Sequence, residues 1–169
     1  HMLGGQAHPA VTIRGIINRG GEQGAQHSQA LHAWFAHVPG LRVVMPATPQ
    51  DASDLLIASV LCDDPVVYID DRWLYDWEDD LPAVVERPLE LEGPRVLRAG
   101  DDLTLVGAGF STRLCLQAAV ELATQGVAAE VVDLRVINPL DPTPVVQSVA
   151  KTGRLVVVDG GWRTCGLAG

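Results

Sequence analysis

The sequence predicts an α/β protein in which parallel sheets are flanked by helices. Continuous apolar runs of the kind found in buried strands, such as Leu41–Pro46 and Pro65–Ile69, alternate with segments of helical spacing. The alternation occurs twice, before and after a stretch rich in acids and prolines. Close alternation of strands and helices indicates right-handed crossovers between parallel strands. We therefore expect a domain over 1–72, a linker over 73–102 and a second domain over 103–169.

The first part of the chain predicts a strand, a glycine-rich loop and a helix. Val11–Arg14 is rich in β-branched residues and ends at Gly15, so it fits a strand that leads into the loop. Ser28 is suited to cap the helix, and Pro39-Gly40 ends it. His27 would then lie at the junction between loop and helix. The expected apolar face of this helix carries Leu31, Trp34, Phe35 and Val38.

A second helix is predicted after the strand Leu41–Pro46. Thr48 can cap this helix, Pro49 suits its first position, and Asp51 places a negative charge in its first turn. The strand Pro65–Ile69 comes next and completes a strand–helix–strand unit. The residues of the helix that follow helical spacing are Ala52, Leu55, Leu56, Ser59 and Val60.

The stretch between the two α/β patterns has a different character. Asp70–Asp80 is acidic and contains Trp73, Tyr75 and Trp77, and prolines follow at positions 82, 88 and 94. We expect an interdomain linker with one edge strand. The acidic run is either a solvated face or, given its aromatic residues, a contact surface for a partner subunit.

A second α/β pattern begins at the strand Leu103–Gly107. The string Gly107-Ala108-Gly109 joins this strand to a helix and lacks the third glycine of a dinucleotide-binding loop. We interpret it as a tight strand-to-helix turn. The remaining elements are a strand over 127–134, a helix from Asp141-Pro142 to about Lys151, and a strand over 155–158 that exits through Asp159–Gly161.

Composition and charge exclude several classes of function. The chain has 169 residues, 47% of them apolar, and a formal charge of -9. This charge disfavours a nucleic-acid partner and an anionic membrane surface. No apolar run approaches the roughly 20 residues that span a bilayer. Because Cys62, Cys115 and Cys165 are widely spaced, we expect reduced thiols in a cytoplasmic protein.

The order of motifs from Gly24 to Val67 is similar to that of a known family. It resembles the beta subunit of the thiamine-diphosphate-dependent 2-oxo acid dehydrogenase component, of the pyruvate, branched-chain and acetoin types. The resemblance implies part of a transketolase pyrimidine-binding domain followed by part of a transketolase C-terminal domain. The motifs that carry it are Gln26-His27-Ser28-Gln29, an aromatic helix ending in His37-Val38-Pro39-Gly40-Leu41, Val43-Val44-Met45-Pro46, and Asp63-Asp64-Pro65-Val66-Val67.

The resemblance implies an active site shared by two subunits. In that family an alpha subunit holds thiamine diphosphate through magnesium, using a Gly-Asp-Gly string that this sequence lacks. The glutamate that activates the cofactor lies upstream of the segment matched here. The resemblance also implies a heterotetramer of two alpha and two beta subunits, a lipoyl acyltransferase that receives the acyl group, and a small 2-oxo acid as substrate. We expect this chain alone to be inactive.

His27 is the active-site residue of the family that maps onto this chain. From the residues alone, a histidine at such a junction is either a hydrogen-bonded structural residue or a chemical one. The resemblance implies a catalytic, cofactor-facing side chain beside the thiazolium ring and the 2-oxo acid. There it would stabilise the substrate carboxylate or the developing alkoxide and assist proton movement, which suits a pKa of about 6.5. His37 is expected to be structural, and His8 and His32 carry no signal.

The resemblance further implies a potassium ion held by main-chain carbonyls near the end of the second helix. The matching positions are Ser59, Cys62 and Asp64. Cys62 stands where the family usually has aspartate, but ligation by a carbonyl does not depend on the side chain.

The loop Gly15–Glu22 leaves two alternatives open. It is bulkier and more charged than the glycine-rich loop of the family, so a split transketolase-like subunit that transfers a two-carbon ketol unit in a biosynthetic pathway is one alternative. A non-catalytic assembly module is the other. His1-Met2 is either a cloning remnant or the start of a family string, and the family continues beyond Gly169. We therefore expect an internal portion of a longer subunit.

Overall fold

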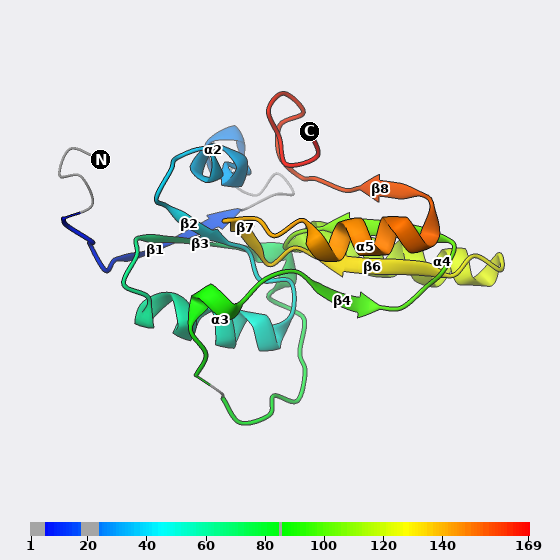
Figure 1. Ribbon diagram of the computed structural model, residues 1–169, viewed down its shortest axis with the longest axis horizontal. Helices are drawn as coiled ribbons and strands as arrows, with labels where there is room; N and C mark the ends of the chain where they lie inside the picture. Colours follow the sequence, from blue (N-terminus) through cyan, green and yellow to red (C-terminus); the bar gives the residue numbers. More distant parts are fainter. Residues whose placement is uncertain (1–5, 18–23, 85) are drawn as a thin grey trace.

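The computed structural model describes residues 6–17, 24–84 and 86–169, and it forms two four-stranded sheets over these residues. Figure 1 shows the sheets following one another along the long axis of the molecule. Helix α2 (His32–Ala36) and helix α3 (Pro49–Leu61) lie on opposite sides of the first sheet in this view. The predicted α/β class is confirmed. Among the described residues, no helix is long and apolar enough to cross a membrane.

The first sheet is built from both halves of the chain. Its strand order is β1-β3-β2-β7, and β1, β3 and β2 are parallel to one another. The fourth strand, β7, is antiparallel to β2 and comes from the second half of the chain. The parallel arrangement expected for the first half holds for β1, β3 and β2, whereas β7 adds an antiparallel strand that the sequence did not predict. The strands are β1 (Thr12–Ile17), β2 (Arg42–Val44), β3 (Val66–Asp71) and β7 (Val136–Asn138).

The second sheet has the order β4-β6-β5-β8. Strand β5 is parallel to β6 and to β8, whereas β4 is antiparallel to β6 and lies at the edge. The single edge strand predicted in the stretch 73–102 is thus β4, and it belongs to the second sheet. The strands are β4 (Arg95–Arg98), β5 (Leu103–Gly107), β6 (Ala129–Asp133) and β8 (Leu155–Val157).

The start of α3 is as predicted from its sequence. Thr48 is the N-cap, its hydroxyl accepts a hydrogen bond from the Asp51 backbone N–H at 3.1 Å, and Pro49 opens the helix. Cys62 ends it in an extended conformation. The other helical segments are α1 (Gly24–His27), α4 (Phe110–Thr124), α5 (Thr143–Thr152), η1 (Arg72–Leu74) and η2 (Leu89–Leu91).

The aromatic helix expected after Ser28 differs from the prediction. Ser28 does not cap it; the Ser28 hydroxyl donates to the Gly24 carbonyl at 2.8 Å and closes the short helix α1. Helix α2 starts only at His32, and its N-cap Leu31 makes no side-chain hydrogen bond. Of the expected apolar face, Leu31, Trp34 and Val38 are exposed, and the buried side chain of α2 is His32.

The two sheets share their main apolar core. Val43 and Met45 from the first half of the chain pack in one cluster with Val106 and Val132 from the second. Gly109 lies directly against Met45, because a Cβ placed on this glycine would come within 3.2 Å of the Met45 methyl carbon. The cluster contains Ile17, Val43, Met45, Val67, Ile69, Val106, Ala108, Val132, Leu134 and Ile137.

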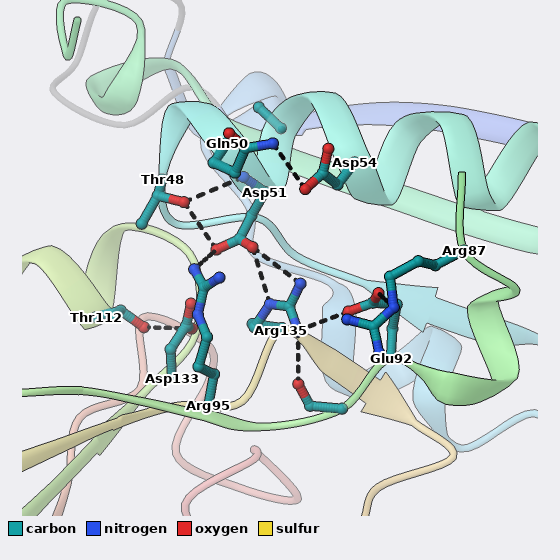
Figure 2. Close-up of polar contacts among 12 residues, drawn as sticks. Thr48, Gln50, Asp51, Asp54, Arg87, Glu92, Arg95, Thr112, Asp133 and Arg135 are labelled. Carbon is teal, nitrogen blue, oxygen red and sulfur yellow. Dashed lines mark hydrogen bonds and ion pairs between the residues drawn. The ribbon is translucent and has the colours of Figure 1, made fainter. Parts of the chain in front are cut away.

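A buried ionic network joins α3 to the second half of the chain (Figure 2). The Asp51 carboxylate is fully buried and pairs with Arg135 at 2.9 Å and with Arg95 at 2.8 Å. Arg135 also contacts Glu92 at 2.8 Å and donates to the Gly93 carbonyl at 3.0 Å. Buried charges need such partners, since an unpaired charge in the interior is costly.

Arg135 stands at the point where the chain leaves the second sheet for the first. It lies between β6 and β7, and its φ of 56° is in the left-handed region that arginine rarely adopts. Its carbonyl accepts from the Met45 backbone N–H at 2.8 Å. The network in Figure 2 therefore holds the residue at which the chain turns from one sheet into the other.

Asp133, at the end of β6, is buried close to the same network. Its carboxylate accepts a hydrogen bond from the Thr112 hydroxyl at 2.8 Å, as Figure 2 shows. Burial raises the pKa of Asp133 to about 7, and the negative charge of Asp51 acts in the same direction, against the Thr112 bond and the arginines.

The aromatic part of the acidic run packs on the second half of the same chain. The Trp73 ring meets Phe110 edge to face at 4.7 Å, and the Arg113 guanidinium lies 4.7 Å from the centre of the Trp77 ring. Both partners are on α4. These contacts give the aromatic residues an intramolecular role at the junction of the two halves.

The turn between β5 and α4 has the tight geometry expected of its glycines. A Cβ on Gly107 would lie 2.7 Å from the Thr112 backbone nitrogen, so no side chain fits there. Gly109 adopts a positive φ of 55° at the start of the helix. This close approach accounts for the glycines without a bound dinucleotide.

Candidate active site

His27 is the last residue of α1, and its side chain is exposed to solvent. The helix comprises four residues, begins at Gly24 with a positive φ of 68°, and has no buried residue. An exposed imidazole at the end of such a segment is accessible to a ligand or to a partner surface. The aliphatic core does not enclose it.

His32, five residues further on, lies in a very different environment. Only 2% of the residue is exposed, and its Nε2 lies 2.9 Å from the Asp159 Oδ1. Asp159 follows β8, so this contact joins α2 to the last part of the chain. His32, for which the sequence indicated no role, is thus a buried residue that links α2 to the end of the chain.

Asp159 organises the loop that follows it. Its carboxylate accepts hydrogen bonds from the backbone N–H of Gly161 at 2.8 Å and of Leu167 at 2.7 Å. Burial alone would raise the pKa of Asp159, but the contact with His32 and the backbone N–H groups outweigh it and lower the pKa to about 2. The carboxylate is therefore ionised throughout the physiological pH range.

A cavity of about 570 Å³ lies between α2 and the loop after Asp159. Its wall is largely apolar and includes two indole rings, and the described residues that line it include no lysine or arginine. Such a wall does not suit a diphosphate, which needs cations or a metal. The lining residues are Ala30, Leu31, Ala33, Trp34, Ala36, His37, Trp162, Thr164, Cys165, Gly166 and Leu167.

A smaller cavity of about 160 Å³ lies on the other side of the segment, against β1 and β3. Leu31 lines both cavities. Gln29 and Phe35 line the smaller one together with Ile17 and Ile69. Leu31, in the stretch that connects His27 to α2, therefore lies between the two cavities.

The positions predicted for potassium are close together at the end of α3. The Ser59 carbonyl already accepts two hydrogen bonds, from the Thr12 hydroxyl at 2.8 Å and from the Cys62 backbone N–H at 3.4 Å. An ion at this carbonyl would compete with these donors for the oxygen. The potassium site stays a prediction.

Side chains near this position form a separate cluster. Cys62, Asp64 and Glu90 bring ligand-type atoms within 4.8 Å of one another. Arg42 forms ion pairs with Asp64 at 2.9 Å and with Glu90 at 3.2 Å, so one guanidinium already compensates part of the charge of the two carboxylates. Burial raises the pKa of the Cys62 thiol.

Sequence reasoning missed the pair formed by His32 and Asp159. His32 lies outside the apolar face of the expected helix, and its partner is 127 residues away. One usable signal was present, because Asp159 directly follows the last predicted strand and polar residues at the carboxyl ends of parallel strands often face a site.

Two family models match the chain. The transketolase pyrimidine-binding domain matches residues 1–76, and the transketolase C-terminal domain matches residues 94–169. The chain is 40% identical to the acetoin:2,6-dichlorophenolindophenol oxidoreductase subunit beta of Cupriavidus necator, over 99% of this chain and 49% of the relative. It is also 40% identical to a pyruvate dehydrogenase E1 component subunit beta of Rhizobium meliloti, over 96% of this chain and 35% of the relative. The chain spans about half the length, or less, of these curated relatives.

Solved structures give the same fold. An inactive beta4 tetramer of a split-gene transketolase superposes with a TM-score of 0.75 at 25% identity, over 92% of this chain and 50% of the other. A transketolase variant from Pichia stipitis has a TM-score of 0.58 at 20% identity, over 80% of this chain and 20% of the other. The second likeness concerns the fold alone.

Proposed function

Because the chain belongs to the transketolase family through a pyrimidine-binding domain and a C-terminal domain, we propose that it is part of the beta subunit of a thiamine-diphosphate-dependent 2-oxo acid dehydrogenase. The observation that carries this proposal is 40% identity, over nearly the whole chain, to the beta subunits of an acetoin:2,6-dichlorophenolindophenol oxidoreductase and of a pyruvate dehydrogenase E1 component. The reaction is the oxidative decarboxylation of a small 2-oxo acid with transfer of the acyl group to lipoyl.

His27 is the residue of this chain that acts in the reaction. The cofactor, when bound, supplies the electron sink for loss of the carboxylate. His27 donates a hydrogen bond to the substrate carboxylate or to the oxygen of the reacting carbonyl, where negative charge develops. It also moves a proton at its ring nitrogen during acyl transfer, because an imidazole can be donor or acceptor near neutral pH. Its exposure on α1 supports this role, since both substrate and partner must reach it.

The partner supplies what this chain lacks. The sequence has no Gly-Asp-Gly string, and the part of the cavity wall beside α2 that the structure describes has no lysine or arginine. We therefore assign the diphosphate and its magnesium to an alpha-type subunit, in a cytoplasmic heterotetramer of two alpha and two beta chains. A lipoyl acyltransferase takes the acyl group from this assembly.

The test is reconstitution of the full-length chain with its alpha-type subunit. We expect acyl transfer to lipoamide that depends on a 2-oxo acid and on thiamine diphosphate. His27→Ala should lower turnover by about a hundredfold or more, the scale of a general acid–base group, with little change in cofactor affinity. His8→Ala is the control, because the exposed His8 side chain lies beside Asp64, at 3.9 Å, and its removal should leave turnover unchanged. Near-normal turnover of His27→Ala would remove this residue from the mechanism.

The second candidate is a split transketolase subunit, favoured by the structural match to a split-gene transketolase. The same reconstituted complex distinguishes the two. Transfer of a two-carbon ketol unit to an aldehyde, without lipoamide acylation, would support the second candidate and refute the first. Complex formation without either reaction would leave an assembly module as the function.

A further inference from the structure

The segment that carries His27 has little to hold it in place by itself. Helix α1 has four residues and α2 has five, and neither length is stable in isolation. The N-cap of α2 makes no side-chain hydrogen bond, and α1 has no buried residue. The position of His27 must therefore be determined by a tertiary contact nearby.

Ala30, Phe35 and Ala36 pack against the main apolar core, and the directional contact of the segment is the buried pair of His32 and Asp159. His32 is the one residue of α2 that is buried, and its Nε2 lies 2.9 Å from the Asp159 Oδ1. Among the described residues the other ring nitrogen, Nδ1, has no hydrogen-bond partner, so Asp159 provides the directional contact that orients the ring. Asp159 is itself fixed by the N–H groups of Gly161 and Leu167.

The packing around the ring is tight as well. A Cβ on Gly161 would come within 3.1 Å of the His32 Cε1, so the loop passes directly over the imidazole. An apolar side chain could fill the same volume, and a buried ion pair is seldom more stabilising than a well-packed apolar contact. A directional polar pair, in contrast, can define the rotation and the register of the helix that carries it, as buried polar groups do in some proteins.

We propose that His32 is a positioning residue: its pair with Asp159 lets the loop 159–167 of the C-terminal domain fix how α1 presents His27 to the substrate. This inference rests on the proposed function for its effect on turnover. The structural part, the immobilisation of residues 24–31 by the pair, does not depend on which reaction is catalysed. The geometry on which both parts rest is the contact between α2 and the loop, 127 residues apart in the chain.

The experiment uses the full-length chain in complex with its alpha-type subunit. His32→Leu fills the volume but removes the polar contact, Asp159→Asn removes the charge, and His32→Gln retains an N–H donor on a side chain of similar reach. Lys151→Met is the matched control, because it breaks an ion pair with Glu130 inside the second domain, away from α2. The measurements are kcat, KM, thermal midpoint, thiamine diphosphate affinity, and hydrogen exchange of the amides of residues 24–31.

For His32→Leu and Asp159→Asn we expect kcat to fall by about ten- to a hundredfold, the effect of misplacing a catalytic group by about 1 Å. KM and cofactor affinity should change by less than about threefold, and exchange at residues 24–31 should accelerate in both variants. The double variant should be no slower than the worse single one, since both remove the same contact. His32→Gln should restore at least half of the logarithmic loss in kcat, and Lys151→Met should match the wild type.

Unchanged exchange at residues 24–31, or a kcat within twofold of the wild type in a folded His32→Leu complex, would overturn the proposal. If His32→Leu fails to fold, the test depends on His32→Gln, which should recover kcat because it keeps an N–H donor. A His32→Gln complex with a wild-type thermal midpoint but low kcat and rapid exchange would refute the role of the N–H contact. His27→Ala is measured alongside. Normal turnover in that variant would refute the proposed role of His27, while exchange would still report on the pair.

Discussion

Replacing Asp51 with alanine should destabilise the protein by about 3 kcal/mol. Asp51 is fully buried and is the shared partner of Arg95 and Arg135. Its removal leaves the Arg135 guanidinium buried with Glu92 as its remaining carboxylate and with the Gly93 carbonyl. Breaking a buried pair by removing one partner typically costs about 3–5 kcal/mol, because the other charge stays in the interior.

The lower end of that range follows from the rest of the network. The Arg95 side chain is 41% exposed, so water replaces its lost partner at little cost. Glu92 continues to neutralise Arg135 at 2.8 Å. Asp51 also raises the pKa of the neighbouring Asp133, and removing it relieves part of that repulsion. The Thr48 cap survives, since its hydroxyl accepts from the backbone of position 51.

The assay is urea unfolding of the full-length chain, followed by far-UV circular dichroism, with Asp54→Ala as the control. Asp54 lies one turn further along α3 and accepts one hydrogen bond, from the Gln50 amide at 2.7 Å. Its removal should cost about 0.5 kcal/mol, as for other helical pairs of this spacing. A loss below about 1 kcal/mol for Asp51→Ala, or an equal loss for Asp54→Ala, would show that the network does not hold the two halves together.

Three further predictions concern buried groups outside that network's centre. Because burial raises the pKa of Asp133 to about 7, its contribution to stability falls as the pH rises from about 4 to 7. The free energy of unfolding of the wild type should therefore be lower at pH 8 than at pH 5, and Asp133→Asn should remove roughly 2–3 kcal/mol of that difference, at about 1.4 kcal/mol per pKa unit. An unchanged pH profile in the variant would contradict this. The pKa of Asp159 is lowered to about 2, so its contribution to stability is present above pH 4 and is lost as the pH falls toward 2. Asp159→Asn should therefore lower the free energy of unfolding by roughly 2–3 kcal/mol at pH 7 and by little near pH 2, as measured by unfolding at both pH values. Gly107→Ala should cost about 2 kcal/mol or more in the same assay, because its Cβ would meet backbone that cannot move aside, whereas Gly126→Ala, where a Cβ meets nothing within 4 Å, should lose only the milder cost of its positive φ.

Local chemistry explains which elements could be predicted from the sequence. The Thr48-Pro49 start of α3 and the close turn at Gly107 depend on residues within a few positions, so their signals are contained in short strings. Strand β7 could not be found in this way. Val136–Asn138 is too short to show periodicity, and its partner is β2, more than ninety residues earlier in the chain. Long-range pairing of a short strand leaves no local pattern.

The apolar face predicted for the aromatic helix was wrong for a related reason. Leu31, Trp34 and Val38 have the spacing of a buried apolar face, yet all three are exposed and two of them line or flank the cavity beside α2. Periodicity shows that side chains lie on one side of a helix, but it does not say whether that side faces the core or a hollow. The buried polar residue His32 is satisfied by a distant carboxylate, and no spacing rule can locate such a partner.

The two domains recognised by their sequence families are therefore not two independent folding units in this structure. Residues after the linker supply β7 to the first sheet, Val106 and Val132 to its core, and Arg135 to the ionic network around Asp51. The C-terminal domain also supplies Asp159, which holds α2 and through it the segment that carries His27. A substitution in the second domain can consequently affect the first through direct contacts. One contact runs from β6 through Arg135 to the residue after β2, and the other runs from β8 through Asp159 to α2. The segment that bears the proposed catalytic residue thus depends, through His32, on a contact from the half of the chain that does not contain it.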